Sequence, residues 1–385
     1  MILRHFLKQS RFIHVLQQSR FISLTSKRSP FSTIGTAAST PYLSHETITK
    51  ASTNDPTNEY TGAIVFLHGI LGSGQNLRSF ARRIANAYPG TKCVLIDLRA
   101  HGDSPSMDVP GTTATVDACA EDVARLVAHL GIAPDLLWGH SFGGKVVLSL
   151  LSNETLQQHV NDVARSTGGG TSGDAGEYAS SDASDHGVCK AAWVIDSQPG
   201  LVELKGFDSN PNKQSVEGII GTLAQVPPPF DSKEDVMTQL GKHGIERSIQ
   251  KWMTTNVIRN EEDQFVWKFD ISVVKELFVD YCNKDMWPVM GGVGNGGGGG
   301  GGGGDGADGK GGGETTALPV ELHLVRALKN PFWDRPSTPV LLQSALDQNP
   351  HMRVHDVDAG HWLHAEKPRE LFDIMVDEDL EQLLR

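Results

Sequence analysis

The chain has 385 residues, 38% of them hydrophobic, which is enough for one large α/β domain with insertions or for two domains. Its formal net charge of −12 disfavours nonspecific nucleic-acid binding, and no basic patch argues otherwise. The four cysteines lie far apart without zinc-like spacing, which favours free thiols in a reducing compartment. The sequence contains no run of about 18 apolar residues, so we expect no membrane span.

The first 45 residues have a composition of their own. Six Lys or Arg precede the first acidic residue, Glu46, and hydrophobic residues such as Leu3, Phe6 and Leu7 recur between them at near-helical spacing. A basic, serine-rich amphipathic segment without acids is typical of an organellar transit peptide, and the lack of a long apolar core favours mitochondria over secretion. We expect residues 1–45 to direct the protein to the mitochondrial matrix; the alternative is an ordinary basic tail.

Short apolar runs alternate with amphipathic stretches over most of the remaining chain. Runs typical of buried parallel strands lie at 62–69, 92–99, 135–139, 191–200, 320–327 and 352–360. Helical periodicity is clear at 77–88 and 116–131. This order predicts a mostly parallel α/β sheet with helices on both faces, in which ligands bind beyond the carboxyl ends of the strands.

Two segments lack the hydrophobic side chains that a packed structure needs. Residues 161–187 are polar and read as a disordered insertion, and the glycine run at 291–313 reads as a flexible linker. No phosphate-binding glycine motif stands between a strand and a helix, so we expect neither segment to bind a nucleotide. Both are interpreted as spacers.

The stretch Gly139-His140-Ser141-Phe142-Gly143 matches the pattern G-x-S-x-G. It follows a predicted strand and opens a helix, which is the context in which this pattern holds a nucleophilic serine. The glycines allow a tight turn that presents the serine hydroxyl at the edge of the sheet. We therefore expect Ser141 to be a nucleophile; the alternative is an ordinary glycine-rich turn.

A serine nucleophile needs a base, and it needs donors for the oxyanion. His361 follows the last predicted strand and is the predicted base, with His364 three residues further on. The amide of Phe142 and an amide of the loop after the first strand are the expected oxyanion donors, with Ile70 preferred and Leu71 as the alternative. The neighbouring His68 and His101 are expected to brace turns.

The C-terminal histidines could also be read as a metal site. His351, His355, His361 and His364 match no HExxH spacing, and His355 falls within the last predicted strand. We therefore predict no metal and no cofactor for this site.

Residues 201–290 are predicted to form a helical cap inserted before the last strands. Amphipathic stretches run through 215–226, 233–244 and 245–258, and Pro227-Pro228-Pro229 separates the first two. Aromatic residues such as Trp252 and Trp362 are compatible with a medium-sized apolar site, although packing in the core explains each equally well.

Several motifs together resemble the alpha/beta-hydrolase domain-containing protein 11 family, in the order LHGILGSGQNL, DLRAHGDSP, GHSFGGK, VIDSQP and AGHWLHAEKP. The segment 252–272 is also similar to the cap of that family, and the resemblance runs from about residue 63 to 373. It implies an alpha/beta-hydrolase fold and a serine esterase of mitochondria or bacteria, with yeast relatives that move acetyl groups from thioesters to alcohols.

The resemblance also implies which acid completes the triad. In this family the acid follows the strand after the nucleophile helix, which corresponds to Asp196 in VIDSQP. The later position that is usual in α/β hydrolases offers Asp334, with Asp347 further on. Strand-end aspartates often only cap turns, so the three positions remain alternatives.

We thus expect residues 46–200 and 314–385 to form the two parts of an alpha/beta-hydrolase core, with the cap at 201–290 between them. The expected activity is hydrolysis of carboxylic esters, thioesters or lipid esters through Ser141, His361 and Asp196, with an acyl-enzyme intermediate. The alternatives are acyl transfer to an alcohol and a non-catalytic role bound to a mitochondrial enzyme complex. The expected partner is a small ester or lipid substrate.

Overall fold

A computed structural model describes residues 42–51, 62–104, 114–153, 189–292, 320–378 and 380–384. Nearly all of the predicted transit peptide lies outside the described residues, as do the polar insertion 161–187 and the glycine run from residue 293 on. No helix in the described ranges is both long and apolar enough to cross a membrane.

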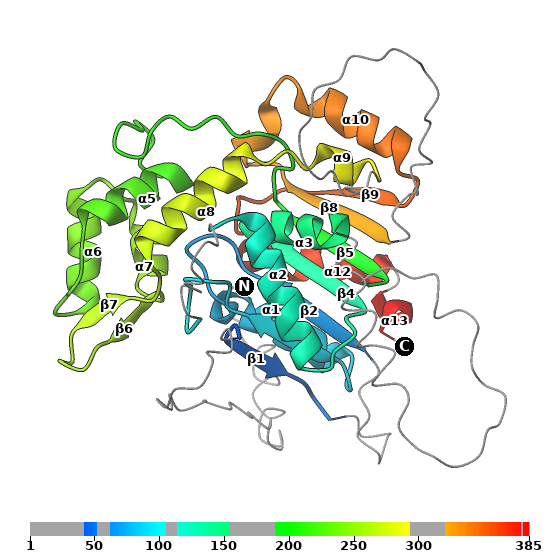
Figure 1. Cartoon of the computed structure of the whole chain (residues 1–385), viewed down its shortest axis with the longest axis horizontal. Coiled ribbons are helices and arrows are strands. Elements are labelled where there is room, and N and C mark those ends of the chain that lie inside the picture. Colours follow the sequence, from blue (N-terminus) through cyan, green and yellow to red (C-terminus); the bar gives the residue numbers. More distant parts are fainter. Residues whose placement is uncertain are drawn as a thin grey trace, which may run out of the picture.

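A seven-stranded sheet forms the centre of the molecule, in the order β1-β3-β2-β4-β5-β8-β9 (Figure 1). Only β1 runs antiparallel to its neighbour β3, and the other neighbouring pairs are parallel. The strands are β1 (His45–Ile48), β2 (Ala63–Leu67), β3 (Lys92–Ile96), β4 (Leu136–His140), β5 (Ala191–Ile195), β8 (Glu321–Ala327) and β9 (Met352–Val357). The predicted alpha/beta architecture with a mostly parallel sheet is confirmed.

The inner strands form because their side chains are apolar on both faces. Every residue of β2 and β4 is buried, as expected for parallel strands covered by helices on both sides. The edge strand β1 was not predicted, because its sequence His-Glu-Thr-Ile is polar and only Ile48 is buried. A polar strand of this kind is typical of a sheet edge.

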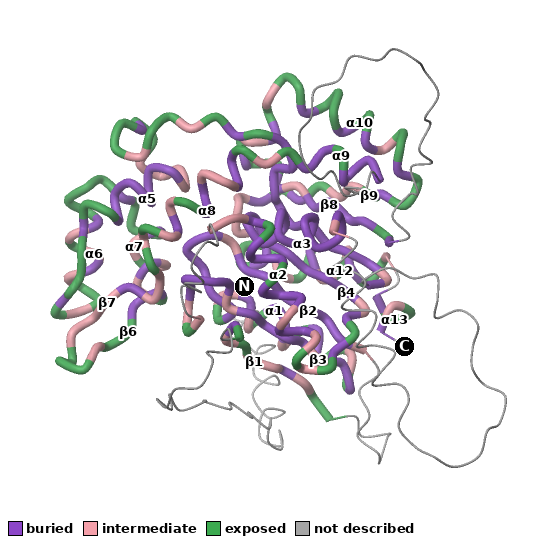
Figure 2. The backbone as a smooth tube through the Cα atoms, viewed as in Figure 1, coloured by how far each residue is buried: buried purple, intermediate pink, exposed green. Residues whose placement is uncertain are grey.

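Helices cover the two faces of the sheet, and the strands of the sheet are mostly buried (Figure 2). The buried apolar residues divide into two cores. One face packs against α1 (Gly74–Ala87), α11 (Leu363–Glu366), α12 (Pro368–Asp377) and α13 (Leu380–Leu383). The other packs against α2 (Val116–His129), α3 (Phe142–Ser152), α9 (Trp287–Met290) and α10 (Thr338–Gln348).

A further group of elements stands between β5 and β8 in the chain and lies beside the sheet (Figure 1). It consists of α5 (Val216–Gln225), α6 (Lys233–Lys242), α7 (Arg247–Met253), β6 (Val257–Arg259), β7 (Phe265–Trp267) and α8 (Ile271–Asn283). The sequence predicted helical periodicity through residue 258, but α7 ends at Met253 and Val257 pairs with Trp267 in a hairpin. Thr254, Thr255, Val257 and Ile258 are β-branched, which favours the strand there.

Candidate active site

Ser141 lies in a strained turn between β4 and α3. Its amide still donates to the carbonyl of Ile195 (2.9 Å), so the ladder with β5 continues up to this residue. The backbone then takes a φ of +52° and a ψ of −117°, a conformation rarely adopted by residues with side chains. A Cβ on Gly139 would collide with the carbonyl of Gly143, so the turn needs glycine there. The sequence pattern at this position therefore reflects backbone geometry.

His361 reaches Ser141 from the loop that follows β9. Its Nε2 lies 3.0 Å from the hydroxyl oxygen of Ser141. Two contacts hold this loop: the amide of Gly360 donates to the carboxylate of Glu366 (2.8 Å), and Nε2–H of His140 donates to the carbonyl of His361 (2.8 Å). The predicted nucleophile and base are thus within hydrogen-bond distance of each other.

Asp196 completes the chain of contacts from the end of β5. Its Oδ2 lies 2.6 Å from Nδ1 of His361, and its side chain is fully buried. The amide of Asp196 continues the ladder to Val325 of β8 (2.7 Å), and a φ of +46° then turns the side chain toward the histidine. Of the three candidate acids, the structure brings Asp196 to His361, while Asp334 and Asp347 are exposed.

Two side chains that the sequence did not single out also donate to Asp196. They come from the loop after β8, where a short 3-10 helix, η1 (Pro331–Asp334), begins. Asn330 donates from Nδ2 to Oδ2 (2.7 Å), and Trp333 donates from Nε1 to Oδ1 (2.6 Å). The amide of Ala327 donates to Oδ1 as well (3.0 Å). With His361, four donors fix one buried carboxylate in a single orientation.

The predicted oxyanion donors lie beside Ser141. The amide of Phe142 is at the N-terminus of α3, where helix amides have no partner within the helix. In the loop after β2, Leu71 donates its amide to Nε2 of His101 (3.0 Å), so this alternative donor is already engaged. Within the described residues, the amides of Ile70 and Phe142 have no acceptor. Both therefore stay candidates for the donors that stabilise an oxyanion next to Ser141.

Two buried histidines brace the loops around these donors. His68 donates from Nδ1 to the carbonyl of Gly69 (2.8 Å) and accepts from the amide of Leu98 (2.9 Å). His101 donates from Nδ1 to the carbonyl of Arg99 (2.9 Å) and accepts from Leu71. Burial lowers the pKa of His68 to about 4 and that of His101 to about 3, so both rings are neutral. Their expected role as structural residues agrees with these contacts.

His364, the predicted neighbour of the base, does not contact Ser141 through any hydrogen bond in the described part of the chain. Its ring packs edge-on against His140, with 4.6 Å between ring centroids, and burial lowers its pKa to about 4. His140 is also buried, and burial followed by the nearby His364 and His361 keeps its pKa well below the usual value. The neutral His140 therefore acts as a hydrogen-bond donor to the His361 loop.

A cavity of about 480 Å³ opens onto Ser141 and His361. Its walls come from the loop after β2, the loop after β8, the His361 loop and the inserted elements α5 and α7. The apolar part of the lining includes Ile70, Val216, Ile219, Ile249, Trp252, Phe332 and Trp362. Trp252 of α7 packs on Trp362 of the His361 loop, with ring centroids 5.4 Å apart, which joins the inserted elements to the core at the cavity wall.

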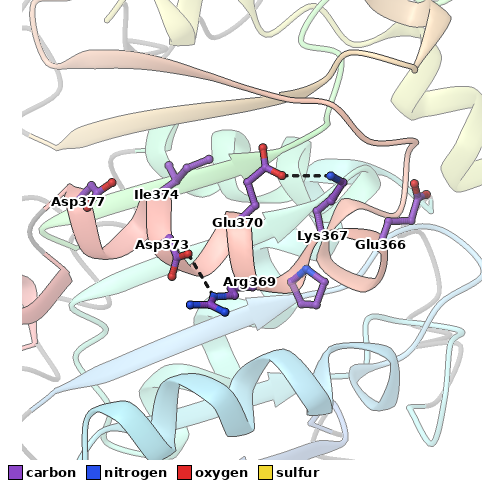
Figure 3. A pocket seen from close by; sticks show the side chains of 8 residues that line it. Glu366, Lys367, Arg369, Glu370, Asp373, Ile374 and Asp377 are labelled. Carbon is purple, nitrogen blue, oxygen red and sulfur yellow. Dashed lines mark ion pairs between the residues drawn. The ribbon is translucent and has the colours of Figure 1, made fainter. Parts of the chain in front are cut away.

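A second hollow, of about 530 Å³, lies over α11 and α12 (Figure 3). Charged side chains surround it, and they pair with each other along the helix. Nζ of Lys367 lies 3.5 Å from Oε2 of Glu370, and Nε of Arg369 lies 3.7 Å from Oδ2 of Asp373. Neither Ser141 nor His361 lines this hollow. Exposed ion pairs between neighbouring turns are ordinary on a helix surface, so they do not indicate a binding site.

Among the described residues, one group has the composition of a metal site. One ligand atom each of His323, His355 and Glu378 lies within 4.8 Å of the others. Nδ1 of His323 already lies 3.1 Å from Nε2 of His355, so a hydrogen bond between the rings explains this pair. His355 belongs to the C-terminal histidine cluster of the sequence, whereas His361 and His364 of that cluster lie at the serine site.

Lys145, in the first turn of α3, is completely buried. Its Nζ donates to the carbonyls of Gly200 (2.9 Å), Tyr281 (2.7 Å) and Lys284 (2.6 Å). These carbonyls lie at the two points where the inserted elements leave and rejoin the core. Burial lowers the pKa of Lys145 to about 7. One side chain therefore ties both ends of the insertion to the helix that begins at the nucleophile.

The chain is similar to known proteins in sequence and in fold. The alpha/beta hydrolase fold family matches residues 62–179. "sn-1-specific diacylglycerol lipase ABHD11" of Danio rerio is 40% identical over 56% of this chain and 56% of its own length, and that of Mus musculus is 40% identical over 23% of this chain and 27% of its own. A solved structure, "Marine microorganism esterase", superposes with a TM-score of 0.60 at 19% identity, covering 87% of this chain and 98% of that chain.

Together, the sheet order, the family match over residues 62–179 and the structural neighbour define an alpha/beta-hydrolase fold. Within that class, the resemblance to the alpha/beta-hydrolase domain-containing protein 11 family, predicted from the motifs, is confirmed by the two relatives named ABHD11. The aligned part of the chain spans about half the length, or less, of these curated relatives.

Proposed function

We propose that the protein is a serine hydrolase of carboxylic esters. The observation that carries this proposal is the unbroken chain of contacts from Ser141 to His361 (3.0 Å) and from His361 to Asp196 (2.6 Å). A hydroxyl next to an imidazole that is itself held by a buried carboxylate is the arrangement that makes serine nucleophilic.

In the proposed reaction, Nε2 of His361 takes the hydroxyl proton as the oxygen of Ser141 attacks the ester carbonyl. The oxyanion is stabilised by the amides of Ile70 and Phe142. The imidazolium, held by Asp196, then protonates the leaving alcohol, which leaves an acyl-enzyme on Ser141. Water, deprotonated by His361, attacks the acyl group and releases the acid, and the proton returns to Ser141.

The cavity supports an ester with an apolar acyl group as the substrate. Its volume of about 480 Å³ falls in the range of small-molecule sites, and Ile219, Ile249 and Trp252 line it with apolar surface. Relatives named diacylglycerol lipases favour a lipid ester. The elements from α5 to α8 act in this proposal as a cap, and Trp252 sets the space available to the acyl chain.

The proposal is tested by the release of p-nitrophenol from esters of increasing acyl length, with protein that lacks residues 1–41 and so keeps β1 whole. Wild type should hydrolyse medium chains best, and Ser141→Ala should be inactive. The ratio of new ester to free acid, measured with ethanol present, reports whether water or an alcohol accepts the acyl group. If wild type and Ser141→Ala are equally inactive over the series, a non-catalytic, partner-binding role becomes the better account.

We also infer that the protein works in the mitochondrial matrix, on the composition of residues 1–45. Imaging of fluorescent fusions tests this inference. The full chain should co-localise with a matrix marker, and a fusion that lacks residues 1–45 should not. A full-chain fusion that stays outside mitochondria would contradict it.

A further inference from the structure

Asn330 lies at the end of the strand next to that of Asp196. β5 and β8 pair in parallel, with Ile195 opposite Val325, so the residues that follow the two strands meet at one edge of the sheet. Asn330 is almost completely buried, and its Nδ2 is 2.7 Å from Oδ2 of Asp196 and 3.4 Å from Nδ1 of His361. The side-chain amide of Asn330 is therefore next to both Asp196 and His361, the proposed acid and base.

The contact of Asn330 with Phe332 determines which way its side-chain amide is turned. Its Oδ1 accepts from the amide of Phe332 (3.2 Å) at the start of η1, and this leaves Nδ2 directed at the carboxylate. Oδ2 of Asp196 thus accepts from both Asn330 and His361. Nδ2 of Asn330 and Nδ1 of His361 both donate here, so the 3.4 Å between them is not a hydrogen bond. The two nitrogens lie close together because they share Oδ2 of Asp196 as acceptor.

We propose that Asn330 is a positioning residue that holds Oδ2 of Asp196 on Nδ1 of His361, and that positions 196 and 330 can exchange the acid and the amide. This inference rests on the proposed function. In the doubly exchanged protein, the amide oxygen at position 196 would still accept from Ala327 and Trp333. The amide nitrogen at position 196 would donate to the new carboxylate at position 330, which is the present hydrogen bond with its direction reversed.

The exchange has a clear consequence for His361. In Asp196→Asn alone, Nδ2–H of the new amide faces Nδ1–H of His361, so two donors oppose each other and the imidazole loses its acceptor. Adding Asn330→Asp supplies a carboxylate oxygen at the place of the present Nδ2, 3.4 Å from Nδ1 of His361. A small rotation of the imidazole closes that distance to a hydrogen bond.

The experiment measures kcat and KM for a p-nitrophenyl ester in Asn330→Leu, Asp196→Asn and Asp196→Asn/Asn330→Asp. Asn330→Leu should lower kcat on the order of tenfold to a hundredfold, the effect of one lost hydrogen bond to a charged group, with KM little changed. The double variant should be at least about tenfold more active than Asp196→Asn. Circular dichroism verifies that each variant is folded.

A matched control is available at Asn349, another buried asparagine. Its Nδ2 donates to the carbonyl of Met290 (3.0 Å) and its Oδ1 accepts from the amide of His351 (3.0 Å), far from the serine site. Asn349→Leu should cost stability but leave kcat close to wild type. If Asn330→Leu affects kcat no more than Asn349→Leu does, or if a folded double variant is no more active than Asp196→Asn, the inference is wrong.

Two further measurements separate this inference from the proposed function. Asn330→Asp alone places two carboxylates side by side, so the pair retains a proton and the acidic limb of the kcat profile should move to higher pH. The rate of labelling by a fluorophosphonate tests the nucleophile without an ester substrate. If wild type is not labelled, the proposed function fails; if wild type and Asn330→Leu are labelled equally fast, only the inference fails.

Discussion

Oδ2 of Asp196 lies 2.6 Å from Nδ1 of His361, although 165 residues separate them in the chain. The contact spans three strand ends: Asp196 follows β5, His361 follows β9, and β8 lies between these strands in the sheet. The loop after β8 bridges the gap, because Asn330 and Trp333 both donate to Asp196. The site is therefore built by neighbouring strands and would be lost if their order changed.

The choice of acid gives the first prediction. Asp196→Asn should lower kcat by on the order of a thousandfold or more, because the imidazole loses the group that orients it and stabilises its charge. Asp334→Asn should leave kcat near the wild-type value, since Asp334 is exposed at the end of η1. Steady-state kinetics on one ester compare the two variants. Equal losses in both, or a loss in Asp334→Asn alone, would contradict the assignment.

The oxyanion donors give the second prediction. Ile70→Pro removes one amide proton, and kcat should fall by about a hundredfold or more while Ile70→Val stays active. Thermal unfolding of both variants shows whether the loop after β2 is intact. A folded Ile70→Pro protein with wild-type kcat would exclude this amide as a donor.

Lys145 gives a prediction about stability. Burial lowers its pKa to about 7, whereas in the unfolded chain the amine keeps its ordinary value near 10.5. Between these values the unfolded chain binds the extra proton, so the free energy of unfolding should rise with pH by up to about 1.4 kcal/mol per unit. Lys145→Met lacks this contribution. In urea unfolding from pH 7 to 10, the free energy of unfolding of wild type minus that of Lys145→Met should grow with pH; a constant difference would contradict the burial argument.

The buried histidines give the corresponding prediction on the acid side. The pKa of His101 is lowered to about 3 by burial, then by the nearby His68. Below pH 6.5 the unfolded chain takes up a proton at this position that the folded protein does not, so folding stability falls as the pH falls from about 6.5 toward 3. His101→Gln should weaken the pH dependence of the free energy of unfolding between about pH 6.5 and 5. An unchanged slope would show that His101 is charged in the folded protein.

Much of the fold could be predicted because buried parallel strands have continuous apolar sequences. The runs that became β2, β3, β4 and β5 stand out for this reason. The hairpin β6–β7 could not be found in the same way. Its strands have three residues each, and their pairing depends on a turn and on neighbours distant in the chain.

The site was predictable only in part, for a related reason. The turn around Ser141 leaves a local signature, because glycines are required at fixed positions. Choosing Asp196 over Asp334 depends on which strand ends meet, and the residues alone left that choice open. No local sequence pattern marks Asn330 or Lys145 as part of the site. Lys145 is buried where the two ends of the insertion, at Gly200 and Tyr281, pack against α3 and present their carbonyls to its amine.

The most direct measurement of the central claim is mass spectrometry of the protein after reaction with a fluorophosphonate. We predict one adduct per chain, on the peptide that contains Ser141, and no adduct in Ser141→Ala. His361→Ala should be labelled far more slowly, because the hydroxyl loses its base. An unlabelled wild type, or an adduct on a different residue that persists in Ser141→Ala, would contradict the account.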